Sequence, residues 1–142
     1  MPRSSVVKQK VAELAQHCCE YCRCPAAFSS QPFSADHIHP KSKGGKAVME
    51  NTAFACQGCN NHKYDKITGF DPVSKVIVPL YHPRQHVWGE HFAWNDNFQL
   101  LIGLTAIGRA TIETLHLNRL EVVNIRRVLY MTGEHPCFLG NR

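Results

Sequence analysis

Two cysteine pairs, each with a two-residue gap, constrain the fold of this chain more than any other feature. They are Cys19-Glu20-Tyr21-Cys22 and Cys56-Gln57-Gly58-Cys59. The gap lets both thiolates of a pair reach one tetrahedral zinc ion, and two pairs supply all four ligands. Four sulfur ligands leave the ion no open position, so we predict a structural Zn²⁺ site. In comparable sites metal binding contributes on the order of 10 kcal/mol to folding.

The remaining cysteines leave alternatives open. Cys18 and Cys24 lie beside the first pair and could replace one of its ligands, and the distant Cys137 is predicted to be a buried or free thiol. The pairs could also be unligated thiols or local disulfides, and a redox protein would need a reactive, unligated thiol. The odd total of seven cysteines and the lack of an apolar signal-peptide region favour metal over a disulfide scaffold.

Composition indicates a globular protein with a polyanionic partner. Hydrophobic residues make up 44% and charged residues 19% of the 142 residues, enough for one domain or a small module with an extension. Lys and Arg number 16 against 11 Asp and Glu, and a net charge of +5 is compatible with binding nucleic acid. No apolar run approaches the roughly 18 residues of a membrane span. We therefore expect a soluble, cytoplasmic protein without membrane contact.

Periodicity predicts an α+β fold in two parts, residues 1–70 and residues 71–142. The first part is predicted to hold a helix over 5–17, a short strand over 33–38, a loop over 41–47 and a helix that begins near Cys59 or Asn60. The second part is predicted to pack on the first as an extension. It would hold a short strand over 76–78 and a β-hairpin with arms 88–94 and 98–104. Thr105 would cap a helix that runs to about Leu117, and Asn118 with Glu121 would form the capping box of a last helix.

The segment between the cysteine pairs places an acid beside a histidine. Asp36 offers a carboxylate, Asn60 offers an amide oxygen, and hard cations such as Mg²⁺ prefer oxygen ligands. His37 titrates near neutral pH and can take a proton from water. Adjacent strand residues point to opposite faces, so Asp36 and His37 would need the bend that Pro40 and the following glycines allow. These groups fit hydrolysis of a phosphodiester.

The same residues resemble the HNH endonuclease family, whose core is a ββα-metal fold. The resemblance covers roughly residues 17–66. It is carried by Cys19 to Cys22, Asp36-His37-Ile38-His39-Pro40-Lys41-Ser42-Lys43-Gly44-Gly45, Glu50-Asn51-Thr52, and Cys56-Gln57-Gly58-Cys59-Asn60-Asn61-His62-Lys63. The second part of the chain resembles the extension of some bacterial members through Pro83-Arg84, Trp88, His91-Phe92, Trp94, Gly108-Arg109-Ala110-Thr111 and Asn118-Arg119.

The resemblance implies a role for each of these residues. His37 would be the general base, Asp36 a ligand of the catalytic metal, and Asn51 a brace for the loop that carries the histidine. Asn60 stands where the commonest family form has histidine, and its oxygen favours Mg²⁺ or Mn²⁺. His62 is the alternative ligand, although residues two apart on a helix do not share a face.

Lysines around this segment are candidates for contacts with the phosphate backbone. They are Lys41, Lys43, Lys46 and Lys63. Such contacts position nucleic acid without reading its sequence.

The sequence thus predicts a metal-dependent endonuclease that cuts DNA, with RNA as an open possibility and either a monomer or a homodimer as the active form. The main alternative is a non-catalytic zinc-ribbon module that binds nucleic acid. Such a module would not need Asp36, because a carboxylate repels phosphate unless a cation intervenes.

Overall fold

The computed structural model describes residues 2–137 and the side chains of residues 5–137. The helices are α1 (Pro2–Leu14), α2 (Gln57–Lys63), α3 (Trp88–His91), α4 (Ala106–Leu115) and α5 (Leu120–Thr132). The strands are β1 (Ser34–His37), β2 (Thr52–Ala55), β3 (Thr68–Phe70), β4 (Ile77–Pro79), β5 (Phe92–Trp94) and β6 (Leu101–Gly103). The strands form antiparallel pairs, β1 with β2, β3 with β4 and β5 with β6. The prediction of an α+β fold is confirmed.

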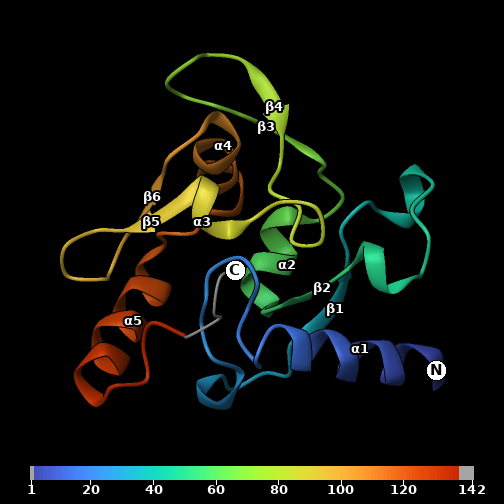
Figure 1. Cartoon of the computed structure of the whole chain (residues 1–142), viewed down its shortest axis with the longest axis horizontal. Helices are drawn as coiled ribbons and strands as arrows, with labels where there is room; N and C mark the ends of the chain where they lie inside the picture. The colour runs from blue at the N-terminus through green and yellow to red at the C-terminus, as the bar shows by residue number, and fades with distance from the viewer. Residues whose placement is uncertain (1, 138–142) are drawn as a thin grey trace.

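Strands β1 and β2 and helix α2 form a compact ββα unit (Figure 1). The register pairs Asp36 with Ala53 and His37 with Thr52. Every residue of β2 is buried, because α1 packs along both strands and covers them. Helix α2 begins at Gln57, two to three residues earlier than predicted, and α1 ends at Leu14, before His17. Gln16 and His17 adopt positive φ angles that a helix cannot continue, and the chain turns there into the first cysteine pair.

The extension differs from the predicted hairpin in its first arm. Residues 88–91 form the short helix α3, and only Phe92–Trp94 are strand. The alternation of apolar and polar residues over 88–94 predicted a strand. Trp88 and Phe92 are also four residues apart, which is the spacing of residues on one face of a helix. Both side chains are buried, with ring centroids 5.3 Å apart. In the second arm Leu101 is buried, and the alternating Leu100, Ile102 and Leu104 are exposed.

The two long helices of the extension begin differently from each other. Thr105 caps α4 as predicted, since its hydroxyl accepts a hydrogen bond from Gly108 N at 3.1 Å. Asn118 does not cap α5, which begins at Leu120. Its side-chain amide instead pairs with the backbone of Leu101 in β6, accepting from N at 2.8 Å and donating to O at 2.9 Å. The capping-box prediction is therefore wrong, because a strand claims the side chain that the cap would use.

Buried charged side chains join the extension to the ββα unit. Arg126 of α5 is 1% exposed and donates to Cys22 O at 3.1 Å, to Leu117 O at 2.7 Å and to Gln99 O at 2.8 Å. Arg84 forms a short ion pair with the buried Glu20. The division at residue 70 remains a prediction, and the β3–β4 hairpin spans it.

A disulfide joins Cys18 to Cys137, across 119 positions of sequence. The prediction of a buried or free Cys137 thiol is wrong. After α5 the chain returns to the first cysteine pair, and the buried His135 bonds through Nε2 to Phe98 O at 2.7 Å. The return path is a tertiary feature, and sequence spacing gave no sign of it.

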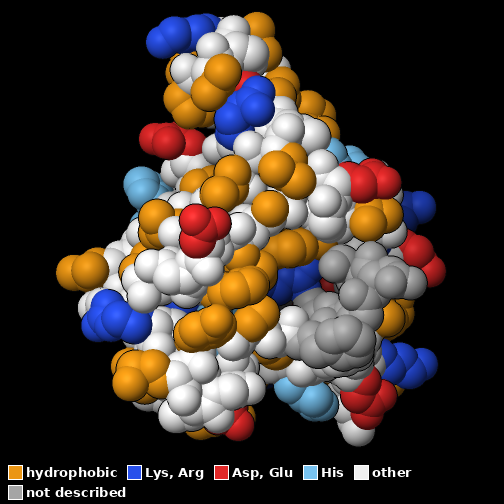
Figure 2. Space-filling model, turned by 60° about the vertical axis from the view of Figure 1, so that its left-hand side comes forward, with side chains coloured by type: hydrophobic (Ala, Val, Ile, Leu, Met, Phe, Trp, Pro, Cys, Tyr) orange, Lys and Arg blue, Asp and Glu red, His pale blue; other side chains and the backbone are white. Residues whose placement is uncertain are grey.

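The face seen in Figure 2 carries apolar side chains between charged ones of both signs. The side chains described on this face therefore form no continuous patch of Lys and Arg. Among residues 2–137, none of the helices combines the length and the apolar character that crossing a bilayer requires.

Replacing the buried Arg126 tests how firmly the extension is bound to the rest of the fold. Arg126→Met keeps most of the side-chain volume but leaves several buried acceptors without donors. We expect the free energy of unfolding to fall by at least about 3 kcal/mol in urea titrations. The matched control is Arg127→Met, because Arg127 is exposed and its guanidinium donates to Asn124 Oδ1, one turn earlier on the same helix, at 2.9 Å. Equal stability of the two variants would contradict the role given to Arg126.

Candidate metal centre and active site

The two cysteine pairs meet in one cluster. The sulfur atoms of Cys19, Cys22, Cys56 and Cys59 all lie within 4.8 Å of one another, and the Cys22 and Cys56 sulfurs are 3.7 Å apart. Zinc–sulfur bonds of about 2.3 Å in a tetrahedron place sulfurs about 3.8 Å apart, so the cluster fits zinc. Cys24 is a free thiol outside the cluster, and Cys18 is in the disulfide. The four predicted ligands are thus the ones brought together.

Local backbone geometry builds each half of the cluster. Cys56 caps α2, and its sulfur accepts a hydrogen bond from Cys59 N at 3.4 Å. The sulfur of Cys19 accepts equivalent bonds from the backbone N–H groups of Tyr21 and Cys22, both at 3.4 Å. Burial raises the pKa of the Cys19 and Cys59 thiols well above the ordinary value. Binding zinc would therefore release protons from them.

Arg119, which sequence reasoning did not assign to the cluster, lies against its open side. Its guanidinium donates to the Cys56 sulfur at 3.5 Å and to the Cys59 sulfur at 3.6 Å. The approach needs the glycine in the second pair, because a Cβ on Gly58 would lie 2.4 Å from Arg119 Nη2. A four-thiolate zinc centre carries two net negative charges, and Arg119 offsets one of them.

Asp36 is the buried carboxylate of β1. Its side chain is 7% exposed, and its Oδ2 lies 3.5 Å from Lys63 Nζ. Within the described residues this oxygen accepts no hydrogen bond. Burial raises the pKa of Asp36 to about 6, against the opposing effect of the Lys63 charge. A buried carboxylate oxygen without a hydrogen bond fits a ligand for a hard cation.

Lys63 differs from its predicted role as a surface phosphate contact. It is 1% exposed, and besides Asp36 it contacts His37 O at 3.1 Å and Ile38 O at 2.8 Å. These bonds fasten the end of α2 to the end of β1. The lysine is directed inward because it lies four residues after the buried Cys59, on the same side of the helix.

The remaining predicted catalytic residues come from the same two elements. His37 is the last residue of β1, half-buried, on the face opposite to Asp36. Asn60 is half-buried and lies one turn before Lys63 on α2, so it shares the side of the helix that faces β1. His62 lies elsewhere on α2, against His116 at the end of α4, with ring centroids 4.6 Å apart. Its contact is with the extension, which sets it apart from Asp36.

Asn51 joins the two ends of the loop that follows β1. Its Oδ1 accepts from His39 N at 2.8 Å, and its Nδ2 donates to His39 O and to Lys46 O, both at 2.9 Å. His39 Nε2 in turn bonds Lys43 O at 2.8 Å. The loop that follows Asp36 and His37 is therefore held in one conformation.

The three other predicted phosphate contacts lie on this loop. Lys41 and Lys46 are exposed. Lys43 is also exposed, but its amine bonds Asp65 O at 2.9 Å and forms an ion pair with the Asp65 carboxylate at 3.5 Å. The loop thus presents positive charge beside the end of β1.

Comparison with known proteins agrees with this geometry. The model of the HNH endonuclease family matches residues 19–66, the span from the first zinc ligand past the end of α2. Residues 19–66 thus match an HNH endonuclease domain. The chain is also similar to the Septu protein PtuB of Bacillus thuringiensis, with 25% identity over 128 residues. That similarity covers 89% of this chain and 46% of PtuB, so the chain spans about half the length of this curated relative. No solved structure matches.

Several contacts around the HNH domain were missed from sequence. The inward direction of Lys63 could have been predicted from sequence. Lys63 lies four residues after Cys59 and three after Asn60, a spacing that places the three residues on one side of a helix. The position of Arg119 left no such signal, since it comes from the extension, 60 positions beyond Cys59. The partnership of Glu20 with Arg84 was likewise hidden by distance along the chain.

Removing the guanidinium beside the HNH domain's zinc ligands should weaken metal retention. We expect Arg119→Gln to release zinc to a colorimetric chelator 10- to 100-fold faster than the parent, because an outer partner of the ligands is lost. Arg127→Gln is the control with the same loss of charge on the exposed side of α5. Equal release by both variants would show that Arg119 does not support the metal.

The raised pKa of Asp36 predicts a pH-dependent stability. Between its unfolded pKa of about 4 and its folded pKa of about 6, the folded protein binds more protons than the unfolded chain. The contribution of the protonated Asp36 carboxyl to the free energy of unfolding is complete below pH 4 and is lost as the pH rises through 6. We expect parental stability to fall by about 3 kcal/mol over this interval relative to Asp36→Asn, measured by denaturant titration. The same pH slope in both proteins would refute this assignment.

Proposed function

We propose that this chain is a metal-dependent endonuclease that hydrolyses DNA phosphodiester bonds. One observation carries the proposal. Asp36 presents a buried carboxylate oxygen without a hydrogen bond, and Lys63 anchors its strand to the helix that bears Asn60. A purely structural role would pair the Asp36 charge with Lys63 at 3.5 Å but would leave this oxygen without a hydrogen bond, whereas a bound cation would satisfy it.

Asp36 and Asn60 are the proposed ligands of a catalytic Mg²⁺ or Mn²⁺. Both offer oxygen atoms, and they come from β1 and α2, which Lys63 holds together. When bound, such a cation neutralises the charge that develops on the phosphate and the leaving oxygen. It would also stabilise the ionised form of Asp36, whose pKa is raised by burial.

His37 is the proposed general base. Its imidazole would take the proton of the attacking water, and hydrolysis would leave 3′-hydroxyl and 5′-phosphate ends, as the family resemblance implies. Asn51 supports this role from a distance, because its bonds to His39 and Lys46 fix the loop that begins after His37. Lys41, Lys43 and Lys46 would contact flanking phosphates.

The extension is part of the proposed functional unit. The similarity to PtuB covers 89% of the chain, well beyond the HNH domain, and Arg119, Arg126 and Arg84 tie the extension to the two cysteine pairs. DNA as substrate, the cytoplasm as location, and a monomer or homodimer as the active form remain proposals. The rival is a zinc-bound module that binds nucleic acid without cutting it.

Replacing the proposed base decides between the enzyme and the binding module. We expect His37→Ala to nick supercoiled plasmid 10²- to 10⁴-fold more slowly than the parent in Mg²⁺, because the water loses its proton acceptor. His17→Ala, at an exposed histidine beyond α1, should cut at the parental rate. Treatment with EDTA should stop cleavage, and Mg²⁺ or Mn²⁺ alone should restore it. If His37→Ala nicks as fast as the parent, the proposed mechanism is wrong.

A further inference from the structure

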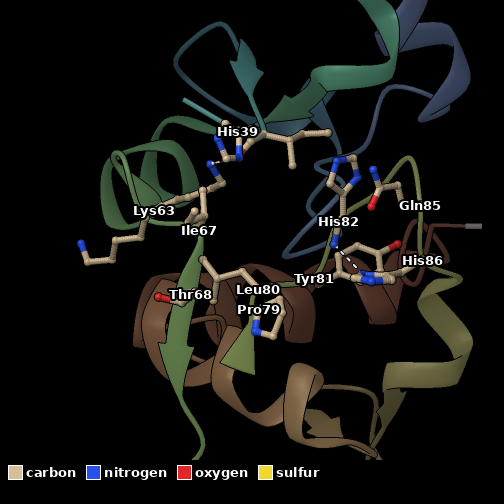
Figure 3. Close-up of a pocket in the computed structure, with 12 residues that line it drawn as sticks. His39, Lys63, Ile67, Thr68, Pro79, Leu80, Tyr81, His82, Gln85 and His86 are labelled. Carbon is tan, nitrogen blue, oxygen red and sulfur yellow. Dashed lines mark hydrogen bonds between the residues drawn. The ribbon is translucent and has the colours of Figure 1, made fainter. Parts of the chain in front are cut away.

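A pocket of about 350 Å³ lies between the HNH domain and the extension, beside the proposed cleavage site. We call it the histidine pocket. Its HNH side is formed by Ile38, His39, Lys63, Lys66 and Ile67, and its extension side by Thr68, Pro79, Leu80, Tyr81, His82, Gln85 and His86. Figure 3 shows His39, Lys63 and Ile67 on one side, His82, Gln85 and His86 on the other, and Leu80 below and between them. Its volume is at the lower end of the range for pockets that enclose small molecules.

The walls combine ring faces with apolar side chains. Tyr81, His82 and His86 form a ring cluster on one side, with Tyr81 and His86 centroids 5.9 Å apart and His82 and His86 centroids 6.3 Å apart. Ile67 and Leu80 supply aliphatic surface. Tyr81 is 3% exposed, so the half-buried imidazoles of His82 and His86 supply the accessible ring surface. Ring faces beside aliphatic surface suit a planar, partly apolar ligand.

The two extension imidazoles are fixed as hydrogen-bond donors. The backbone N–H of His82 donates to His86 Nδ1 at 2.9 Å, and the N–H of Arg84 donates to His82 Nδ1 at 3.2 Å. Because each Nδ1 accepts, the proton of each neutral ring is on Nε2. Burial and the neighbouring His86 lower the pKa of His82, which keeps that ring neutral at pH 7. The pocket therefore offers the Nε2–H of the uncharged His82 ring as a hydrogen-bond donor.

Phosphate is a poor match for this interior. The Lys63 amine is engaged by Asp36 and two carbonyl oxygens, and the amine of the exposed Lys66 donates to His62 O at 3.3 Å. A nucleobase matches better, because it has two flat faces for stacking and an edge that carries hydrogen-bond acceptors. β1 leads from Asp36 and His37 directly into Ile38 and His39, so the pocket lies one or two residues from the proposed cleavage chemistry.

We propose that the histidine pocket receives one unpaired nucleobase of the nucleic acid whose backbone lies at Asp36 and His37. This inference rests on the proposed function for the position of the strand. The base would stack on one imidazole of the pair and accept a hydrogen bond from the other, because the His82 and His86 rings stand at 86° to each other. A base inside a duplex cannot reach such a pocket unless it is unstacked, so the substrate would be single-stranded or locally opened at this position.

The test uses the full-length His37→Ala protein in Ca²⁺ and a short single-stranded oligonucleotide carrying 2-aminopurine. Stacking in the pocket should quench the 2-aminopurine fluorescence. Ile67→Trp places a large side chain in the pocket lining. We expect this variant to bind the oligonucleotide at least about 10-fold more weakly and to lose the fluorescence quench. The control is Ile77→Trp on β4, where the side chain is 71% exposed, and it should bind like the parent. Should Ile67→Trp fail to fold, Gln85→Trp closes the pocket from an exposed position and gives the same readout.

Unchanged quenching and affinity in a folded pocket-filling variant would overturn the proposal. So would equal binding of an oligonucleotide that is abasic throughout, because the backbone alone would then carry the affinity. Plasmid nicking by the His37-containing protein separates this result from the endonuclease proposal. Nicking without a pocket-dependent quench would support the endonuclease proposal and overturn the nucleobase pocket. A pocket-dependent quench without nicking would support the nucleobase pocket and overturn the endonuclease proposal.

Discussion

The fold depends on bringing four cysteine sulfurs to within 4.8 Å of one another. The cluster joins the turn after α1 to the first turn of α2. Because β1 and β2 lie between the cysteine pairs, closing the cluster also holds the hairpin against α2. Burial makes the thiols poor acids, so the arrangement needs a cation to keep them together as thiolates.

The extension completes this centre and is more than a neighbour of it. Arg119 donates to two cluster sulfurs, and Arg126 donates to the carbonyl of Cys22. On the opposite side, Arg84 pairs with Glu20, whose other oxygen accepts from Phe54 N at 2.9 Å in β2. Three cations from the extension thus satisfy acceptors in and around the two cysteine pairs. The structural metal, the HNH hairpin and the extension are coupled by charge as well as by packing.

The proposed chemistry lies at the other end of the same hairpin. Lys63 links α2 to β1 by three contacts, and Asn51 closes the loop beyond His39. Asp36 is thereby held in a desolvated position where it favours a cation. The histidine pocket opens beside it because the extension returns along the end of α2. A single arrangement of elements thus gives the cysteine cluster, the proposed cation site at Asp36 and the histidine pocket.

Sequence by itself determined the features that depend on local spacing. The two-residue gaps fixed the four clustered cysteines, Thr105 marked the start of α4, and the residues from Asp36 to Gly45 marked the HNH domain. Tertiary structure alone decided the approach of Arg119 to the sulfurs, the Cys18–Cys137 disulfide and the histidine pocket. The physical reason is distance along the chain. Spacing determines which side chains share a turn or a helix face, but contacts between residues 60 to 119 positions apart arise only when whole elements pack.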